Sequence, residues 1–445
     1  MLGLGIAGIA WIIWLGRGMT FFADEWAFIE SRSLSDPGTW LLPHNEHWST
    51  LPILAYRALV ETVGIGSYVP YLTLVAVLHG AVVSAVYILV RQSTSNGPVA
   101  MAAALVILLF GSGFENLYWG FQIGFVGATA MCLWAMVALR GEGPPSKRGL
   151  AIAVCLLVAG VATAGITLAF IAVIATELLF DRRRRIFIPW IAIPVAVSVI
   201  WYIFVGRAGT SYVQHPYGLA SPLEVPQFVV LGFGSAFGGV AGVGPTLGLV
   251  AGAAVLVRVA WIASRGRPVA KGFLGSMVGI AALYALIGVV RVGLSPDTIE
   301  YTRYTYVSGV MLVVGLAALV GPVTVPRRRK RRIVLTVFAG GLLATSLVFN
   351  VRLLRAGREL FLDRADMTRA LVAVALDPGR PPGVDLGRSL VLVPSPASLE
   401  RIVAAFGSPL GDSLAPDAVR PIPPDILAEA RRRLIEGAPI PTAGG

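Results

Sequence analysis

Apolar runs of about 20 residues recur along this chain, and they constrain its fold more than any other feature. A helix needs about 20 apolar residues to cross the hydrocarbon core of a bilayer. Charged residues make up 13% of the sequence, against about 25% in soluble domains. The sequence therefore predicts an all-α polytopic membrane protein with about eleven transmembrane helices. The predicted spans are residues 2–20, 68–90, 98–110, 121–139, 150–163, 167–180, 187–206, 243–263, 273–291, 305–325 and 333–350.

The basic residues are distributed unequally between the connectors. Five alternate connectors, among them 181–186 and 326–332, carry 17 Lys or Arg, and the other five carry four. Positive connectors stay in the cytoplasm, so we expect a cytoplasmic N-terminus and an extracytoplasmic C-terminus. The formal net charge of +12 then reflects topology, and no nucleic-acid partner is expected. Arg replaces Lys nearly everywhere, which is typical of a GC-rich bacterial genome and favours a bacterial cytoplasmic (inner) membrane.

The two ends of the chain differ in composition. The first 20 residues lack a basic start and a small-residue cleavage site, so we expect a first span and not a removed signal peptide. Residues 351–445 hold 12 Arg against 11 Asp or Glu and no run long enough to span. We predict a transmembrane domain over 1–350 and a small, partly flexible extracytoplasmic α/β domain over 351–445. Its expected elements are a strand at 389–395 and a helix at 426–437.

Two apolar stretches are irregular. Residues 150–180 have basic flanks at both ends and small residues at 162–165, which predicts a hairpin of two short helices with a turn between them. Residues 226–242 are apolar but Gly-rich. We expect this second stretch to lie along the outer face or dip into it.

The acidic residues gather on the predicted outer side. The outer connectors hold ten Asp or Glu and the inner ones hold only Glu142 and Asp181. Acids contribute little to orientation, and solvation of the outer face is the simpler explanation. Asp24 and Glu25, however, lie in FFADEW at the end of the first span. An ionisable group near the membrane is a functional candidate by default.

The segment PHNEHWST, residues 43–50, adds further polar groups. A helix beginning at Pro43 would place His44 and His47 on one face, with Glu46 between them. Imidazoles and carboxylates suit a divalent ion, but the spacing supplies no third ligand. A hydrogen-bonded cluster for a polar substrate is the favoured interpretation, and a metal site is the alternative.

Three other outer segments carry polar residues that plain linkers do not need. Glu115 and Gln122 lie in 114–122, and the loop 207–218 contains Arg207, Tyr212 and His215. The segment 299–309 places Arg303 among several tyrosines, including Tyr301 and Tyr304. A guanidinium binds phosphate with a planar fork, so Arg303 is a candidate anion ligand; an ion pair with Glu300 is the alternative. The tyrosines are also explained as interface anchors.

These motifs resemble the GT-C superfamily of membrane glycosyltransferases. The similar features are the Asp24-Glu25 pair in the first outer loop, the His/Glu-rich continuation, the Arg303-Tyr304 pair before a late span and the trailing outer domain. Related types are protein O-mannosyltransferases, aminoarabinose transferases and mycobacterial arabinofuranosyltransferases, together with a group of bacterial membrane proteins that have similar DEW and PHNEHW stretches. The resemblance covers about residues 1–350 in topology and only short motifs in sequence.

The resemblance implies inverting transfer of a sugar from a polyprenyl-phosphate donor to a polysaccharide, lipid or protein acceptor at the outer face of the bilayer. It implies that Asp24 is the general base, with Glu25 the second catalytic candidate; successive helical residues point about 100° apart, so the two acids are not expected to share one role. Arg303 would meet the phosphate. Some members use a divalent cation (Mg or Mn) and others use none, so His44, Glu46 and His47 are open as metal ligands or as sugar-binding groups; the possible metal ligands are Asp24, Glu46 and His47. The predicted substrate-binding residues are His44, Glu46, His47, Glu115, Gln122, Tyr301, Arg303 and Tyr304.

Two other classes of function remain open on the sequence alone. A transporter or flippase of a lipid-linked or polar solute would need charges along a path through the membrane, whereas Arg17, Glu177, Arg258 and Arg291 lie near the ends of spans. A non-catalytic envelope-assembly protein is the third class. An enzyme requires Asp24, His47 and Arg303 to converge on one outward cavity, and this distinguishes it from the alternatives.

Overall fold

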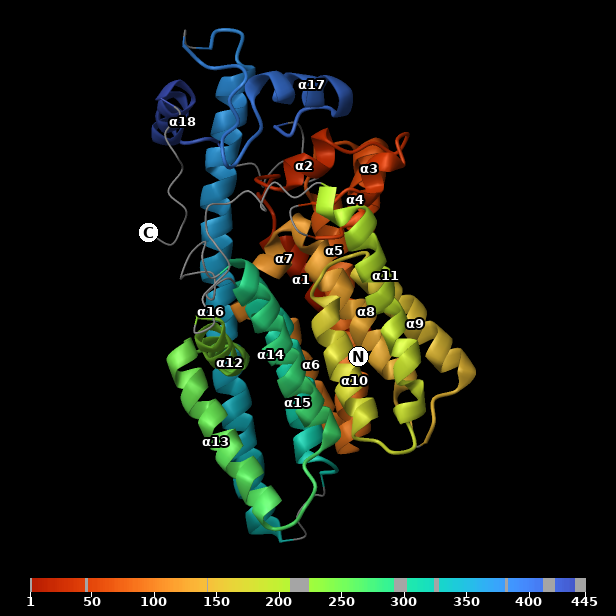
Figure 1. Cartoon of the computed structure of the whole chain (residues 1–445). Coiled ribbons are helices and arrows are strands. Elements are labelled where there is room, and N and C mark those ends of the chain that lie inside the picture. The colour runs from red at the N-terminus through yellow and green to blue at the C-terminus, as the bar shows by residue number, and fades with distance from the viewer. Residues whose placement is uncertain are drawn as a thin grey trace.

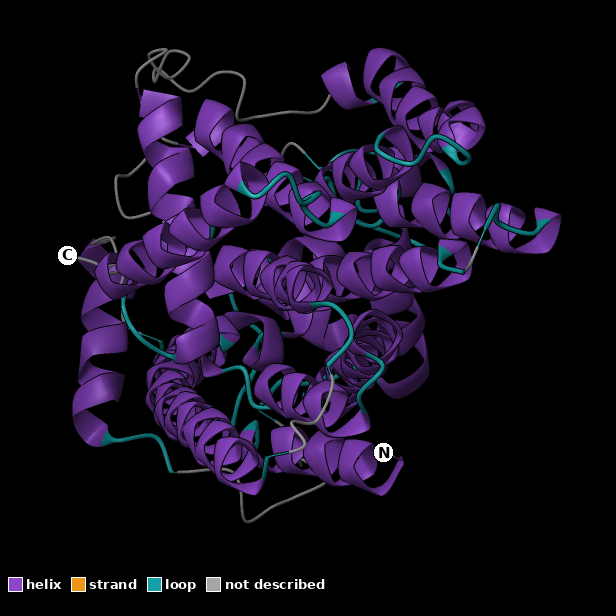
Figure 2. Cartoon of the chain, turned by 90° about the horizontal axis from the view of Figure 1, so that it is seen from below, coloured by secondary structure: helices purple, strands orange, loops and turns teal. Residues whose placement is uncertain are grey.

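The computed structural model describes residues 2–44, 47–141, 143–208, 224–291, 302–323, 328–380, 383–410 and 421–436. Within these ranges the elements are helices and no strand is present (Figure 2). Eight of the described helices are long and apolar enough to cross a membrane, and the chain is a multi-pass membrane protein. They are α5 (Val69–Thr94), α8 (Ile123–Leu139), α11 (Ile188–Phe204), α12 (Glu224–Ala241), α13 (Pro245–Ser264), α14 (Lys271–Arg291), α15 (Thr302–Val320) and α16 (Arg329–Leu376). For α8 and α11 the apolar stretch includes the 3-10 turn that leads into the helix.

Each of the eleven predicted spans overlaps one helix, but four of these helices are short: α1 (Leu2–Leu15), α6 (Gly97–Leu108), α9 (Lys147–Val161) and α10 (Thr167–Leu179). The connectors predicted to be outer also form short helices. These are α2 (Glu25–Glu30), α3 (Gly38–Leu41), α4 (Thr50–Val63) and α7 (Glu115–Tyr118), with 3-10 turns at Gly111–Gly113, Gly120–Gln122, Arg185–Phe187 and Gly206–Ala208.

The predicted hairpin at 150–180 is confirmed. Helices α9 and α10 have 15 and 13 residues, which corresponds to about 20 Å each at about 1.5 Å per residue. Both are shorter than the roughly 30 Å hydrocarbon core. The turn between them, 162–166, packs against the first outer connector, because the Leu51 amide donates a hydrogen bond of 3.2 Å to the Ala162 carbonyl.

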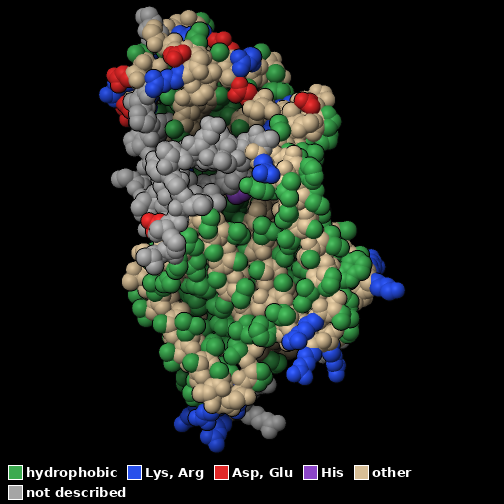
Figure 3. All heavy atoms as spheres, in the orientation of Figure 1, with side chains coloured by type: hydrophobic (Ala, Val, Ile, Leu, Met, Phe, Trp, Pro, Cys, Tyr) green, Lys and Arg blue, Asp and Glu red, His purple; other side chains and the backbone are tan. Residues whose placement is uncertain are grey.

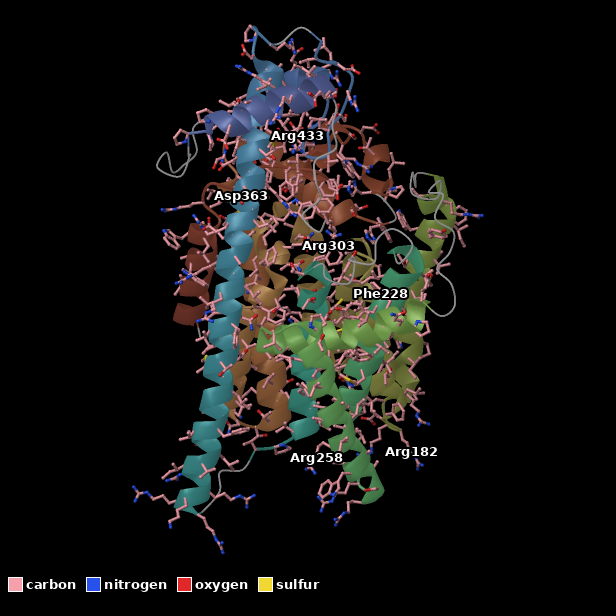
Figure 4. All side chains as sticks on the ribbon, turned by 90° about the vertical axis from the view of Figure 1, so that its left-hand side faces the viewer. Arg182, Phe228, Arg258, Arg303, Asp363 and Arg433 are labelled. Carbon is pink, nitrogen blue, oxygen red and sulfur yellow. The ribbon has the colours of Figure 1, made fainter. Side chains whose placement is uncertain are left out.

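Helix α12 lies across the other helices. It is seen end-on in Figure 1 and lengthwise in Figure 4, nearly perpendicular to α13 and α16 in both views. Its glycines allow this close crossing: a Cβ at Gly232 would lie 2.2 Å from the Tyr284 ring, and one at Gly238 would lie 2.6 Å from the Gly244 carbonyl. The helix meets the length and hydropathy of a span, yet it runs crosswise, as the Gly-rich sequence led us to expect.

The C-terminal region differs from the prediction. Helix α16 runs without a break for 48 residues, about 72 Å at the helical rise, so the predicted domain boundary after residue 350 falls inside a helix. The predicted strand at 389–395 is wrong, because this segment forms a turn closed by a Leu390 N–Val393 O hydrogen bond of 3.0 Å. The predicted helix at 426–437 is confirmed as α18 (Pro424–Glu436), and α17 (Pro396–Phe406) lies on the other side of α16 at the top of Figure 1.

Charged side chains concentrate at the two ends of the molecule. On the face shown in Figure 3, Lys and Arg gather at the lower end, Asp and Glu lie at the upper end beside further basic residues, and apolar side chains cover the middle. This arrangement suits a bilayer around the middle of the bundle.

Candidate active site

A cavity of about 70 Å³ lies where the connectors predicted to be outer meet the starts of α8 and α15. Six of the predicted site residues line it: Asp24, His44, His47, Gln122, Arg303 and Tyr304. The hairpin turn contributes Thr163 and Ala164, and the remaining lining residues are Phe28, Ser49, Pro52, Phe121, Gly124 and Phe125. Figure 4 places Arg303 above α12, toward the end of the molecule that carries the C-terminal helices. Helix starts carry a partial positive charge, so this cavity suits a negatively charged group.

Asp24 sits in a constrained loop at the start of α2. The residue before it, Ala23, has φ +52°, a left-handed conformation that is unfavourable for a residue with a Cβ. Two hydrogen bonds of 3.0 Å hold this loop, one from the Ala23 amide and one from the Trp26 indole, and both end on the Leu392 carbonyl. The C-terminal tail therefore fixes the backbone that presents Asp24 to the cavity.

Glu25 occupies a different place from its neighbour. Its side chain is fully buried and is not part of the cavity wall. The carboxylate accepts hydrogen bonds from the Tyr56 hydroxyl, from the Tyr68 hydroxyl (2.9 Å) and from the Phe22 amide (3.0 Å). Burial raises the pKa of Glu25 to about 7, although these hydrogen bonds pull it down. A carboxyl so enclosed is placed to support the loop and not to touch a substrate.

Gly120 completes the surroundings of Glu25. Its amide donates a 2.6 Å hydrogen bond to the Tyr68 hydroxyl. A Cβ here would lie 2.7 Å from the Tyr56 oxygen and 3.0 Å from the Glu25 Oε1, so only glycine allows this approach. The glycine links the first outer loop to the turn that leads into α8.

The backbones of His44 and His47 are hydrogen-bonded to each other. The amide of His44 donates to the carbonyl of His47 and the amide of His47 donates to the carbonyl of His44, both at 3.0 Å. This pairing excludes the helix from Pro43 that would have placed both rings on one face. The ring of His44 packs edge-on against Phe28 at 4.9 Å and Phe121 at 5.3 Å between centroids.

The described residues do not form a metal site. Among them, no group of three or more His, Cys, Asp or Glu side chains is placed to hold an ion. Glu46, the third member of the predicted set with Asp24 and His47, lies outside the described residues.

Arg303 lies in the first turn of α15, and Glu115 holds this helix start. The Oε2 atom of Glu115 accepts hydrogen bonds from the Arg303 amide (3.0 Å) and the Thr302 hydroxyl (3.2 Å). Asn116 Nδ2 donates to the Arg303 carbonyl at 3.0 Å. The Arg303 guanidinium lies 5.2 Å from the centre of the Tyr304 ring. Glu115 thus positions Arg303 instead of lining the cavity, and the predicted Tyr301 lies outside the described residues.

Gln122 has an unsatisfied acceptor at the cavity. Its side chain is 1% exposed, and in the described part of the chain its Oε1 has no hydrogen-bond partner. A buried acceptor without a partner costs about 1–3 kcal/mol. A donor on a ligand or a water molecule in the cavity would satisfy it.

No family model and no curated protein matches the sequence. Among solved structures, the fold is similar to the crystal structure of an oligosaccharyltransferase from Archaeoglobus fulgidus in complex with Zn and sulfate, with 14% identity and a TM-score of 0.39 over 84% of this chain. The chain spans 55% of the length of that protein. A likeness of this extent does not define an activity, so the geometry of the cavity carries the functional argument.

Proposed function

We propose that this chain is an integral membrane glycosyltransferase of the GT-C kind. It transfers a sugar, with inversion, from a polyprenyl-phosphate donor to an acceptor hydroxyl on the outer face of a bacterial cytoplasmic membrane. The observation that carries the proposal is the convergence of Asp24 and Arg303 on one cavity at the ends of apolar helices. A carboxylate and a guanidinium in one cavity supply the two charges that such a transfer needs.

Each group has a role in the proposed reaction. Asp24 removes the proton from the acceptor hydroxyl as its oxygen attacks the anomeric carbon. The bond between this carbon and the donor phosphate breaks, and the lipid phosphate leaves with the electron pair and an additional negative charge. Arg303, at the positive end of α15, stabilises that charge. Gln122 and His47 hydrogen-bond the sugar, and Tyr304 packs beside the guanidinium.

The size of the cavity limits what it encloses. Sites that bury a whole ligand are typically about 300–1,000 Å³, whereas this cavity has about 70 Å³. We therefore place only the reacting atoms in it, with the sugar ring at its mouth and the lipid chain along the membrane helices. Glu25 has no contact with substrate in this proposal.

The direct test is to supply the full-length protein with candidate donors. The protein in lipid nanodiscs would be incubated with a panel of polyprenyl-phosphate sugars and simple alcohol or glycan acceptors, and products would be analysed by mass spectrometry and NMR. The proposal expects a glycosylated product with the anomeric configuration opposite to that of the donor. A parallel assay in proteoliposomes separates the two sides of the bilayer, and net movement of the intact lipid-linked sugar across it without bond cleavage would instead support a flippase.

A further inference from the structure

A second cavity, with a volume of about 590 Å³, lies at the opposite end of the helix bundle from the candidate active site. The C-terminal ends of α5, α8, α10 and α15 and the start of α14 surround it. Its polar wall contains Gln92, Arg140, Glu177, Arg184 and Lys271. Figure 4 shows Arg182, from the same turn as Arg184, near the lower end of the bundle and far below Arg303.

The basic residues of this cavity differ in how they are neutralised. Arg140 forms an ion pair with Glu177 at 3.2 Å, and Lys271 forms one with Asp181 at 2.5 Å. Arg184 is 6% exposed and forms no ion pair with any described acidic residue. One of its terminal nitrogens donates to the Leu139 carbonyl, and its Nε has no acceptor in the described part of the chain. Asp181 lies near enough to Arg184 to interact with it electrostatically, but its carboxylate is paired with Lys271. A buried charge without a close counter-ion is costly, so an anion beside Arg184 would stabilise the site.

The start of α14 adds to the positive character of the cavity. Lys271 and Gly272 form its first turn and line the wall. A Cβ at Gly272 would lie 3.3 Å from Glu177 Oε1 and 3.5 Å from Arg140 Nη2, so the glycine brings the helix start close to this ion pair. The N-terminus of a helix attracts anions through its free amides and its dipole.

Capping of helix ends does not explain the whole arrangement. Arginines often bind the last carbonyls of helices, and Arg140 donates to Leu89 as Arg184 does to Leu139. Capping accounts for these two bonds. Capping does not explain why Arg184 Nε has no acceptor in the described part of the chain. It also does not explain why a cavity of 590 Å³ lies beside this buried cation.

We propose that this cavity binds a phosphate group, with Arg184 and the start of α14 as its ligands. The volume falls in the range of about 300–1,000 Å³ typical of ligand sites. Basic pockets between membrane helices bind the head groups of anionic lipids, and a soluble phosphate compound has the same chemistry. The site does not depend on the function proposed for the other cavity.

The test measures binding to the full-length protein after delipidation in neutral detergent. Phosphatidylglycerol, phosphatidylcholine and inorganic phosphate are added separately, and binding is followed by native mass spectrometry and by the shift in unfolding temperature. We expect phosphatidylglycerol or phosphate to bind and to raise the unfolding temperature, while phosphatidylcholine does so at least tenfold more weakly. Binding of phosphatidylglycerol alone identifies a lipid, and binding of inorganic phosphate identifies a soluble ligand. Binding of neither anion overturns the proposal.

Variants locate the binding to this cavity. Arg184→Gln removes a charge-assisted hydrogen-bond donor and should weaken binding by about tenfold to a hundredfold. Arg182→Gln makes the same change at an exposed position of the same turn and should leave affinity unchanged. Gln92→Glu adds a negative charge at an exposed position of the wall without removing a described contact, so it should weaken binding even if Arg184→Gln fails to fold. Equal affinities of wild type and Gln92→Glu, or of the two arginine variants, would refute the assignment.

Discussion

Replacing Glu25 with glutamine tests the structure of the first outer loop through its pH dependence. Burial raises the pKa of this carboxyl from 4.5 to about 7, so the folded protein holds a proton that the unfolded chain releases. Between these two pH values the folded state binds more protons, and the free energy of unfolding must fall as pH rises. A shift of this size corresponds to about 3 kcal/mol at about 1.36 kcal/mol per unit.

The assay is equilibrium unfolding in detergent at several pH values from 5 to 8. The stability of Glu25→Gln relative to wild type should rise by about 2–3 kcal/mol over this range, because only wild type has the titrating group. Glu359→Gln is the matched control, since that side chain is 61% exposed and should show no such trend. Parallel curves for wild type and Glu25→Gln would refute the buried hydrogen-bonded carboxyl.

Three further substitutions test the parts that hold the candidate site. Arg303→Lys keeps the charge but loses the planar fork, so sugar transfer should fall by roughly tenfold or more in kcat; an unchanged kcat would argue against contact with the phosphate. Glu115→Ala removes the acceptor for the Arg303 amide and the Thr302 hydroxyl and should lower the free energy of unfolding by about 1–2 kcal/mol, measured by the same equilibrium unfolding. Trp26→Phe deletes the indole hydrogen bond to Leu392, with an expected loss of about 1 kcal/mol and reduced transfer; full stability would show that this indole bond does not hold the loop.

Much of the membrane architecture followed from local sequence. Hydropathy located the eleven helices of the predicted spans, because a long apolar run indicates burial in a membrane whatever its neighbours are. It did not mark α12 as a span, although this helix is long and apolar enough to cross a membrane. The hairpin of α9 and α10 followed from the basic residues at both ends of 150–180. The long α16 did not, because its composition changes from apolar to charged near residue 350 while the helical backbone continues. Composition therefore indicated the environment of this segment, and it did not indicate where the helix ends.

The candidate site was predictable only in part, because local sequence does not report contacts between distant residues. Polar residues near predicted helix ends pointed to Asp24, Gln122 and Arg303, and the structure brings these together. The burial of Glu25 depends on Tyr56 and Tyr68, which are 31 and 43 residues away. Such long-range contacts leave no local pattern in one sequence. The hydrogen bonds that the Leu392 carbonyl accepts from Ala23 and Trp26 also join distant parts of the chain, and the sequence did not predict them.

The central claim is that Asp24 is the base of a glycosyl transfer at this cavity. The most direct measurement is the rate of sugar transfer by Asp24→Asn in nanodiscs, compared with Asp363→Asn, which changes an exposed aspartate on α16. A general base contributes about 10²- to 10⁴-fold, so Asp24→Asn should lose at least a hundredfold in kcat while it folds normally and Asp363→Asn retains full activity. Transfer by Asp24→Asn at the wild-type rate would contradict the proposed mechanism.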